Sequence, residues 1–495
     1  MNVASYLLAK HHASKKLFIR GSREKITFKR LYEQVDALAQ YLHDQFGARR
    51  EMFLLSDNSV FFIVSYLGIL RSGNIAVVAD PKLPKGDLDF IIEKCSPAAV
   101  FIQEKYKARA PYALNVLDER FLSQIPNNDL KKLAVPRKGD ENDTALIIFT
   151  SGSTGEKKGV VLTHKNIRAN TDSIIRYLHL THKDVMLVTL PFFYSYGLSL
   201  LHTHLRVGGG LVLHQDVFPK AVIPELKKYR CTGFAGVPMT FQILIRATDF
   251  LSQRFPALTY LTQAGGKLEN ASILKIRSAF PDKKFYVMYG ATEATTRLAY
   301  LPPEKVEERI GSIGKAIPGV DLRVVDESGR GVKPGEVGEI IARGDNIMKE
   351  YYKDPMLTAS VLKNGYYRTG DLATVDEEGF IYIVGRVKNF IKSGGHRISP
   401  YEIQEAIHEM GLQTPCVVVG IPDELFGEAV VALVQTDTPS AEMAAKILTH
   451  CKKTLPSYKV PRRVFFIEVL PMNANGKVDL PKTREYCLQQ YLMKK

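Results

Sequence analysis

The sequence predicts an α/β protein with a large N-terminal body of doubly wound sheets, a small β-rich subdomain, and a smaller, mobile C-terminal α+β domain. Three observations predict this class. The chain has 495 residues, which is too many for one ordinary core. Its first part alternates apolar strand-like segments with amphipathic segments, as parallel sheets with crossover helices do. Beyond about Gly311, closely spaced turn motifs replace that alternation, and such turns favour antiparallel strands.

The N-terminal body is predicted from two helices and a series of apolar strands. Residues 28–46 place Leu31, Val35, Leu38 and Leu42 on one side at the helical period, and residues 59–71 form a second helix that ends at Gly73. The predicted strands are residues 53–55, 75–79, 98–102, 145–149, 185–190, 258–263 and 284–289.

The C-terminal part is predicted to be a separate compact domain. Helices are expected near residues 400–409 and 441–455, with strands at 416–420 and 429–434. We place the boundary at Lys388, so that residues 1–387 form one domain and residues 388–495 the other.

Composition excludes several classes of protein. Apolar residues make up 45% of the chain and charged residues 24%, as in soluble globular proteins. The longest apolar stretch, residues 60–70, is too short to span a bilayer, and the first residues do not form a secretory signal, so we expect a cytoplasmic protein without an integral membrane segment. The five cysteines are odd in number and contain no C-x-x-C pair, which argues against a disulfide framework and a zinc site.

The net charge of +15 leaves several partners open. Nucleic acid, an anionic membrane face and phosphate-rich small molecules would all suit a basic chain. No arginine-rich run, RNA-binding aromatic pattern or recognition-helix signature accompanies the charge, so nucleic acid is not expected. A solvated basic face is the favoured explanation of the charge taken alone.

The most specific motif is TSGSTGEKKG at residues 150–159, directly after an apolar strand. Its glycines allow a tight turn with N–H groups pointing inward, and its hydroxyls and Lys158 add donors, so the loop is suited to holding phosphate. It is not a Walker A loop, because Lys157 stands where that motif has its second glycine.

Further motifs follow in order along the chain. Each is weak alone, because a turn or an exposed carboxylate would explain it. They are Gly265-Gly266, YGATE at 289–293, YRTGD at 367–371, GRVKNFIKSGGHRISP at 385–400 and PMNANGK at 471–477. Together with the glycine loop, in this order, these stretches resemble the adenylate-forming superfamily of acyl- and aryl-CoA synthetases, firefly luciferase and nonribosomal peptide synthetase adenylation domains, and the AMP-forming acyl-CoA synthetases most of all. The resemblance covers about residues 25–485.

The resemblance implies ATP and Mg²⁺ as cofactors, with coenzyme A or the phosphopantetheine of a carrier protein as acceptor. The β- and γ-phosphates would lie on Thr150, Ser151, Gly152, Ser153, Thr154, Gly155 and Lys158, and Mg²⁺ near Thr150 and Glu293. The other implied nucleotide contacts are at the adenine (Gly265, Gly266, Tyr289), in the adjoining motif (Gly290, Thr292) and at the ribose (Asp371, Arg386).

The resemblance also assigns catalytic and mobile residues. Lys477 would bridge the incoming carboxylate and the α-phosphate as a compact cation. Lys388 matches the hinge about which the small domain turns between the two half-reactions, and Lys392 matches a lysine that luciferases use in the second pose. The thiol tunnel would be lined by Gly394, Gly395, His396 and Arg397.

An apolar acyl or aryl acid is the expected substrate. Phe193, Tyr194, Tyr196 and Gly236 suit an apolar pocket, although core packing would explain the aromatic residues as well. Residues 191–215 contain no Asp or Glu to pair with an ammonium group, which disfavours a free amino acid.

Tyr194 stands where many relatives carry histidine, so its role in gating the pocket is open. An acidic acyl carrier protein is the alternative acceptor to coenzyme A, and loading such a carrier with an acyl or amino-acid group is the alternative function. Luciferase-like oxygen chemistry and a nucleotide-binding protein without catalysis are the remaining alternatives.

Overall fold

The computed structural model describes residues 1–21, 23–109, 115–125, 140–151, 157–214, 221–387, 390–410, 412, 414–472 and 478–493, with the side chains of Ser151 and Arg397 left out. The chain forms two compact units. One contains residues 1–265, 274–322 and 342–368, and the other contains residues 266–273, 323–341 and 369–495. The predicted boundary at Lys388 falls outside the described residues and stays a prediction.

A seven-stranded sheet is central to the first unit. Its strands are, in spatial order, β18 (Glu350–Tyr351), β8 (Lys157–Thr163), β7 (Thr144–Ser151), β4 (Ile75–Ala79), β3 (Glu51–Leu55), β5 (Ala99–Ile102) and β6 (Asn115–Leu117). The run from β7 to β6 is parallel, whereas β8 and β18 add antiparallel edges.

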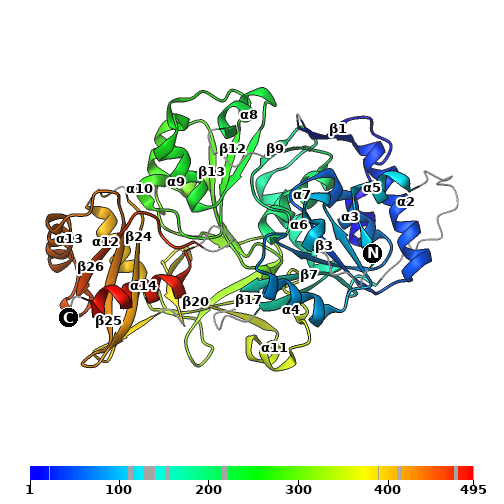
Figure 1. The fold of residues 1–495 in the computed structure, drawn as a ribbon. Helices are drawn as coiled ribbons and strands as arrows, with labels where there is room; N and C mark the ends of the chain where they lie inside the picture. The colour runs from blue at the N-terminus through cyan, green and yellow to red at the C-terminus, as the bar shows by residue number, and fades with distance from the viewer. Residues whose placement is uncertain are drawn as a thin grey trace. The chain divides into compact units, whose positions relative to one another are not determined.

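Alternating side chains of this sheet enter two different cores. Phe53, Leu55 and Val77 pack with helix α4 (Lys85–Cys95) on one face. Met52 and Leu54 pack on the other face with helices α1 (Val3–Leu8), α2 (Phe28–Phe46) and α3 (Val60–Arg71), and α2 and α3 pack against each other (Figure 1). Burial on both faces explains why these strands are continuous apolar runs in the sequence. The doubly wound prediction is confirmed.

A nine-stranded sheet forms the rest of this unit. Its strands, in order, are β15 (Lys315–Ala316), β14 (Ala299–Leu301), β13 (Lys284–Tyr289), β12 (Tyr260–Gln263), β11 (Gly233–Gly236), β9 (Val185–Val188), β10 (Gly210–Leu213), β1 (Leu17–Arg20) and β2 (Lys25–Thr27). The remaining helices of the chain up to residue 361 are α5 (Glu119–Gln124), α6 (His164–Leu178), α7 (Ser195–Val207), α8 (Val222–Lys228), α9 (Pro238–Ala247), α10 (Asn270–Ala279) and α11 (Pro355–Val361).

The β-rich part after residue 311 is a five-stranded sheet, as the turn motifs predict. Its strands are β16 (Val320–Val325), β17 (Gly338–Gly344), β20 (Tyr366–Val375) and β19 (Leu362–Lys363), with β21 (Ile381–Arg386) paired to β20. The chain passes between the two units inside β16, β17 and β20.

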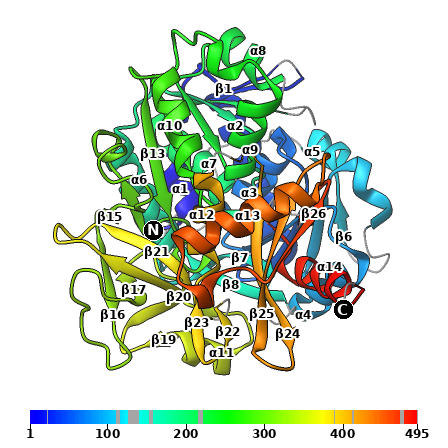
Figure 2. The ribbon, with the colours of Figure 1, turned by 90° about the vertical axis from the view of Figure 1, so that its left-hand side faces the viewer.

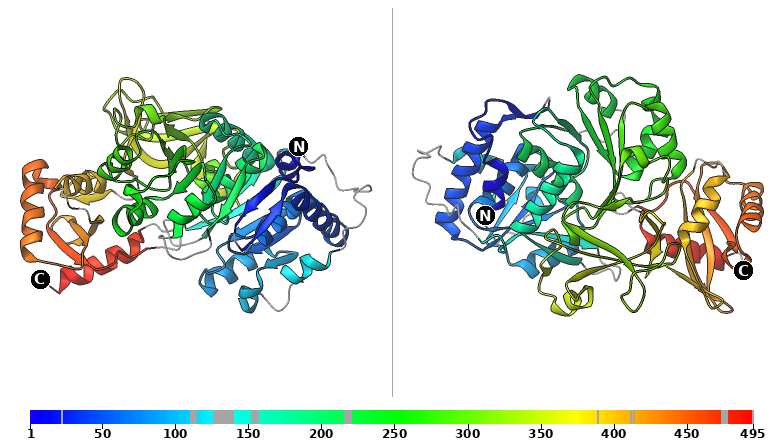
Figure 3. Two further views of the ribbon diagram at one scale, coloured as in Figure 1. Left: turned by 90° about the horizontal axis from the view of Figure 1, so that it is seen from above. Right: turned by 180° about the vertical axis from the view of Figure 1, so that it is seen from behind.

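The C-terminal α+β fold has one sheet between two helical layers. Its strands are β23 (His396–Ile398), β22 (Ile391–Ser393), β25 (Gly427–Gln435) and β24 (Cys416–Asp423), with β26 (Arg463–Ile467) paired to β25. Helices α12 (Pro400–Glu409) and α13 (Ala441–Thr454) lie side by side on one face (Figure 2). Helix α14 (Leu480–Leu492) packs on the other face, as the view from above shows (Figure 3).

Most element predictions are confirmed. The helices at 28–46 and 400–409 and the strands at 75–79 and 284–289 have the predicted bounds. Among the described residues, no helix is long and apolar enough to cross a membrane. The strongly apolar helix α3 is only 12 residues long, and nearly all of it is buried in the protein core.

Candidate active site

The predicted phosphate loop begins and ends on paired strands. Thr150 on β7 lies opposite Lys158 on β8, and Ser151 lies opposite Lys157. The predicted loop residues Gly152, Ser153, Thr154 and Gly155 lie outside the described residues. The sequence reasoning did not identify β8, whose short apolar run follows the loop so closely that it could equally have begun a helix.

Lys157 has a specific partner near the loop. Its ammonium lies 3.1 Å from the Asp87 carboxylate of α4. Lys157, which stands where a Walker A loop has its second glycine, therefore links β8 to α4 by an ion pair.

Lys158 and Glu293 both lie next to Tyr351. The Tyr351 hydroxyl donates a hydrogen bond of 2.7 Å to Glu293 Oε1, and Lys158 Nζ lies 5.6 Å from the centre of the Tyr351 ring. Lys158 and Glu293 thus share Tyr351 as a neighbour, and Thr150 lies opposite Lys158 in the strand pairing. Their roles at ATP and Mg²⁺ stay predictions.

The pairing of β18 with β8 explains why Tyr351 is at this position. Tyr351 lies opposite Val160, two residues along β8 from Lys158. The Met348 N–H also donates to the Glu293 carbonyl at 2.8 Å, so the segment before β18 holds the Glu293 backbone as Tyr351 holds its side chain. Sequence reasoning missed Tyr351, because nothing in the run Lys349–Tyr352 distinguishes it from its neighbour Tyr352.

Three of the predicted acid pocket residues, Phe193, Tyr194 and Tyr196, lie at the start of α7, whereas Gly236 ends β11. Phe193 and Tyr194 pack edge to face with ring centres 4.7 Å apart, and burial raises the pKa of the Tyr194 hydroxyl. The Tyr196 hydroxyl is held by Thr262, at 2.9 Å from its Oγ1 and 3.1 Å from its carbonyl oxygen. Gly236 has no room for a side chain, because a Cβ there would lie 2.9 Å from the Phe241 ring.

The pocket segment and the YGATE segment are in contact. Ser195 Oγ lies 3.3 Å from Thr292 Oγ1, and the Thr296 hydroxyl donates to the Ser195 carbonyl at 2.9 Å. A Cβ on Gly290 would overlap the Thr296 carbonyl oxygen, so only glycine allows the chain to turn back here. Tyr289, predicted to stack on adenine, is nearly buried at the end of β13.

The two predicted adenine glycines fall on either side of a unit boundary. Gly265 belongs to the first unit and has a positive φ of 90°, and Gly266 begins a short segment of the second unit. That segment is anchored to α12 by an ion pair of 3.0 Å between Lys267 and Glu405.

In the second unit, Asp371 and Arg386 are paired directly. They lie opposite each other on β20 and β21, and Arg386 Nε lies 2.6 Å from Asp371 Oδ1. The Asp371 backbone N–H donates to the Thr369 hydroxyl, which itself donates to the Ile340 carbonyl. Burial, aided by the Asp371 charge, raises the pKa of the nearby Tyr401 hydroxyl. The aspartate is thus held by its neighbours, and its role as a ribose ligand stays a prediction.

The predicted thiol-tunnel residues form a tight hairpin between β22 and β23. Gly394 and Gly395 are the two turn residues, with φ of 56° and 80°, a turn in which residues with a side chain are disfavoured. The next residue, His396, stacks on Tyr458 with ring centres 4.1 Å apart, and the predicted Lys392 is exposed on β22. The side chain of Arg397 is not among those described.

The predicted hinge Lys388 and catalytic Lys477 lie outside the described residues. Met472 and Val478, on either side of the stretch that contains Lys477, form an antiparallel bridge. The roles of both lysines stay predictions.

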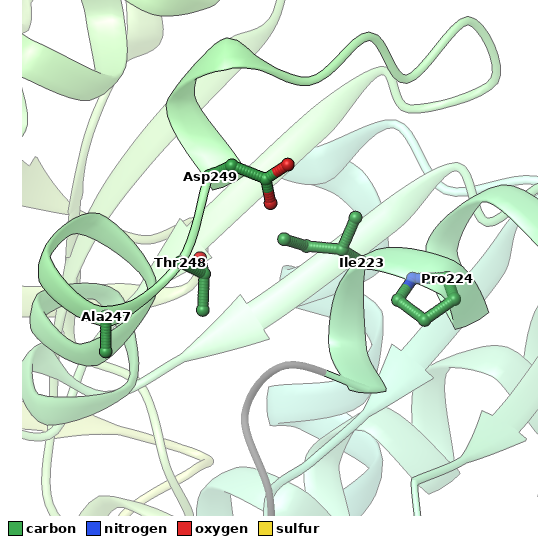
Figure 4. A pocket seen from close by; sticks show the side chains of 5 residues that line it. All are labelled: Ile223, Pro224, Ala247, Thr248 and Asp249. Atoms are coloured by element: carbon green, nitrogen blue, oxygen red, sulfur yellow. The ribbon is translucent and has the colours of Figure 1, made fainter.

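A pocket of about 450 Å³ lies elsewhere, next to α8 (Figure 4). It is lined by Ile223, Pro224, Ala247, Thr248 and Asp249. The Thr248 hydroxyl already donates to the Leu244 carbonyl, and none of the predicted site residues lines this pocket. We therefore do not place the reaction there.

Comparison with known proteins decides the family. A model of the AMP-binding enzyme family matches residues 8–352, and a model of the AMP-binding enzyme C-terminal domain matches residues 402–477. The chain belongs to the AMP-binding enzyme family.

Relatives with curated names are CoA ligases. The indoleacetate–CoA ligase of Aromatoleum aromaticum is 30% identical over 97% of this chain and 96% of its own length. The feruloyl-CoA synthase of an Amycolatopsis species is 34% identical over 68% of each chain.

Solved structures agree over almost the whole chain. ATP-bound MatB from Rhodopseudomonas palustris superposes with a TM-score of 0.87 at 25% identity, covering 99% of both chains. The anthranilate CoA ligase AuaEII, with a TM-score of 0.90 at 21% identity, shares the fold. The family and these relatives identify the protein as an AMP-forming acid–thiol ligase, which activates a carboxylic acid with ATP and forms a thioester with coenzyme A.

Proposed function

We propose that the protein adenylates an apolar acyl or aryl carboxylic acid in the first unit and transfers the acyl group to coenzyme A. The contacts of Lys158 and Glu293 with Tyr351, together with the pairing of Thr150 with Lys158, carry this proposal. A basic side chain and a fixed carboxylate at the mouth of a glycine loop suit a triphosphate with its metal ion better than any uncharged ligand.

The donors near the loop fit Mg²⁺. Thr150 and Glu293 would offer a hydroxyl and a carboxylate oxygen, which are hard ligands, and Mg²⁺ commonly binds through one or two carboxylates together with substrate phosphates and water. When bound, it would neutralise phosphate charge as pyrophosphate leaves. Tyr351 would keep the Glu293 carboxylate oriented toward that role.

The acid would enter beside the start of α7. Phe193 and Tyr196 are buried in the core and Tyr194 is partly buried, so this segment is apolar. Residues 191–215 contain no carboxylate that could pair with a substrate ammonium. The names of the curated relatives, indoleacetate–CoA ligase and feruloyl-CoA synthase, support an aryl acid among the candidates.

The reaction would follow two transfers. The substrate carboxylate oxygen attacks the α-phosphorus and displaces pyrophosphate, and the thiol of coenzyme A then attacks the acyl carbon, loses its proton and displaces AMP. Lys477 would stabilise the charge that develops in the first transfer, and removal of such a contact typically costs a factor of about 10²–10³ in rate. Turning about Lys388 would bring the Gly394-Gly395 hairpin to the site for the second transfer.

Coenzyme A as acceptor follows from the relatives, and an acyl carrier protein remains the alternative that an experiment must test. Pyrophosphate release would be measured with a panel of aliphatic, aryl and amino acids, followed by thioester formation with coenzyme A or with a phosphopantetheinylated carrier protein. Turnover of apolar acids with coenzyme A supports the proposal. Turnover of amino acids alone, or of carrier protein alone, contradicts it.

The assignment of the two lysines has its own test. Lys477→Ala should reduce ATP–pyrophosphate exchange, and Lys388→Pro should spare exchange but reduce thioester formation. The two-pose mechanism would be ruled out if Lys477→Ala kept ATP–pyrophosphate exchange and Lys388→Pro kept thioester formation.

A further inference from the structure

Arg297 is a buried guanidinium without a carboxylate partner. Arg297 is only 3% exposed. Among the described residues, no carboxylate lies within ion-pair distance of its guanidinium. Arg71, in the same unit, is also buried, but its Nε lies 2.8 Å from Oδ1 of the buried Asp36. A buried charge without a partner is costly, so Arg297 needs an explanation that Arg71 does not.

The groups around Arg297 are weak partners for a guanidinium. Nε donates to the thioether sulfur of Met288 at 3.3 Å, and Nη1 donates to the Thr296 carbonyl at the same distance. Sulfur is a poor acceptor. The Tyr177 hydroxyl, which donates to that same sulfur at 3.1 Å, also forms a side-chain hydrogen bond with Arg297, but it is a neutral group. The guanidinium also lies 4.1 Å from the centre of the Tyr196 ring, which stabilises a cation but accepts no strong hydrogen bond.

Arg297 lies between the YGATE segment and the segment proposed to bind the acid. It follows the YGATE segment, where the chain returns beside Gly290, and its side chain lies on Tyr196, a residue of the proposed pocket. The neighbouring contact between Ser195 and Thr292 links the same two segments. The guanidinium is therefore adjacent to the segment that is proposed to bind the acid.

We propose that Arg297 binds an oxygen acceptor at the end of the substrate acid that is remote from the reacting carboxylate. The substrate is then an acyl or aryl acid that carries a second carboxylate, a hydroxyl or a carbonyl group, and an anionic oxygen complements the buried charge best. This inference rests on the proposed function, because it uses the acid pocket around Tyr196.

Matched pairs of acids test the proposal. Adenylation kcat/KM would be measured by pyrophosphate release for hexanoate against adipate and 6-hydroxyhexanoate, and for cinnamate against 4-hydroxycinnamate. The wild-type enzyme should favour the oxygen-bearing members by roughly ten- to a hundred-fold, the range expected for a hydrogen bond to a charged group. Comparison of adipate with 6-hydroxyhexanoate distinguishes an anionic acceptor from a neutral one.

Substitution then assigns the preference to Arg297. Arg297→Met keeps the length of the side chain and removes its charge, so it should lower kcat/KM for the oxygen-bearing acids and leave their plain partners nearly unchanged. Arg297→Lys keeps the charge and should retain part of the preference. An equal loss for both members of each pair, with unchanged thermal unfolding, would show a structural role and overturn the inference.

Other outcomes are also decisive. If neither variant folds, the wild-type panel still decides, because a preference for the plain acids overturns the inference. Silence with every acid would contradict the proposed function itself, whereas activity without any preference would contradict the role of Arg297 alone.

Discussion

In the proposed phosphate site, the orientation of the Glu293 carboxylate depends on a single neighbouring side chain. Tyr351 donates to this carboxylate, and its ring also lies near Lys158, so one residue orients both charges. Its neighbour Tyr352 makes a similar bond of 2.9 Å to Glu51, which is not among the site residues. Tyr351 and Tyr352 thus form similar hydrogen bonds to two different carboxylates, so their phenylalanine variants are a matched pair.

Tyr351→Phe should lower kcat/KM for ATP–pyrophosphate exchange by about ten-fold, because it removes a hydrogen bond to a charged group. Tyr352→Phe removes a comparable bond and should leave exchange nearly unchanged. Exchange kinetics at saturating and limiting Mg·ATP measure both effects. If the two variants lose activity equally, Tyr351 has no orienting role of its own.

At the scale of the element, the start of α7 depends on one close backbone approach. The chain folds back between Pro191 and Gly197, where a Cβ on Gly197 would overlap the Pro191 carbonyl oxygen. This approach places Ser195 beside Thr292 and Tyr196 on Arg297. The pocket segment therefore has its shape because position 197 carries no side chain.

Gly197→Ala should destabilise the protein by about 1–3 kcal/mol, the usual cost of overpacking. The control is Gly86→Ala in α4, where a Cβ would meet nothing within 4 Å and helix propensity favours alanine. Urea unfolding of both variants measures the difference. Equal unfolding midpoints would show that the turn before α7 relaxes without cost.

At the scale of the whole molecule, buried neutral histidines make stability depend on pH. Burial lowers the pKa of His164 and His204 to about 4 and that of His202 to about 3, from an ordinary value of 6.5. The unfolded chain binds these protons below pH 6.5, whereas the folded chain does not bind them until about pH 4 at His164 and His204 and about pH 3 at His202. Stability is therefore fully present above pH 6.5 and falls as the pH drops toward 4.

Each of these histidines should lower the free energy of unfolding by about 1.4 kcal/mol per pH unit across that range. His202→Gln, which can still accept the hydrogen bond from Tyr66, should remove about one third of their summed slope. The exposed His12 supplies the control, since His12→Gln should leave the slope unchanged. Denaturant unfolding between pH 7 and pH 4 measures these slopes, and an unchanged slope in His202→Gln would contradict a neutral His202.

The sequence by itself determined the elements with a clear period or a continuous apolar run. Helix 28–46 follows from one apolar stripe, and strands such as 75–79 follow from burial on both faces. The order of the motifs likewise indicated the family, because each glycine loop or motif carboxylate lies within a short stretch that can be read directly from the sequence.

Only the tertiary structure decided which side chains meet. Tyr351 reaches Glu293 because β18 pairs with β8, and Arg297 reaches Tyr196 because the chain returns beside Gly290. These partners are 58 and 101 residues apart. No local periodicity carries such information, because strand pairing and the burial of a charge depend on contacts between distant segments.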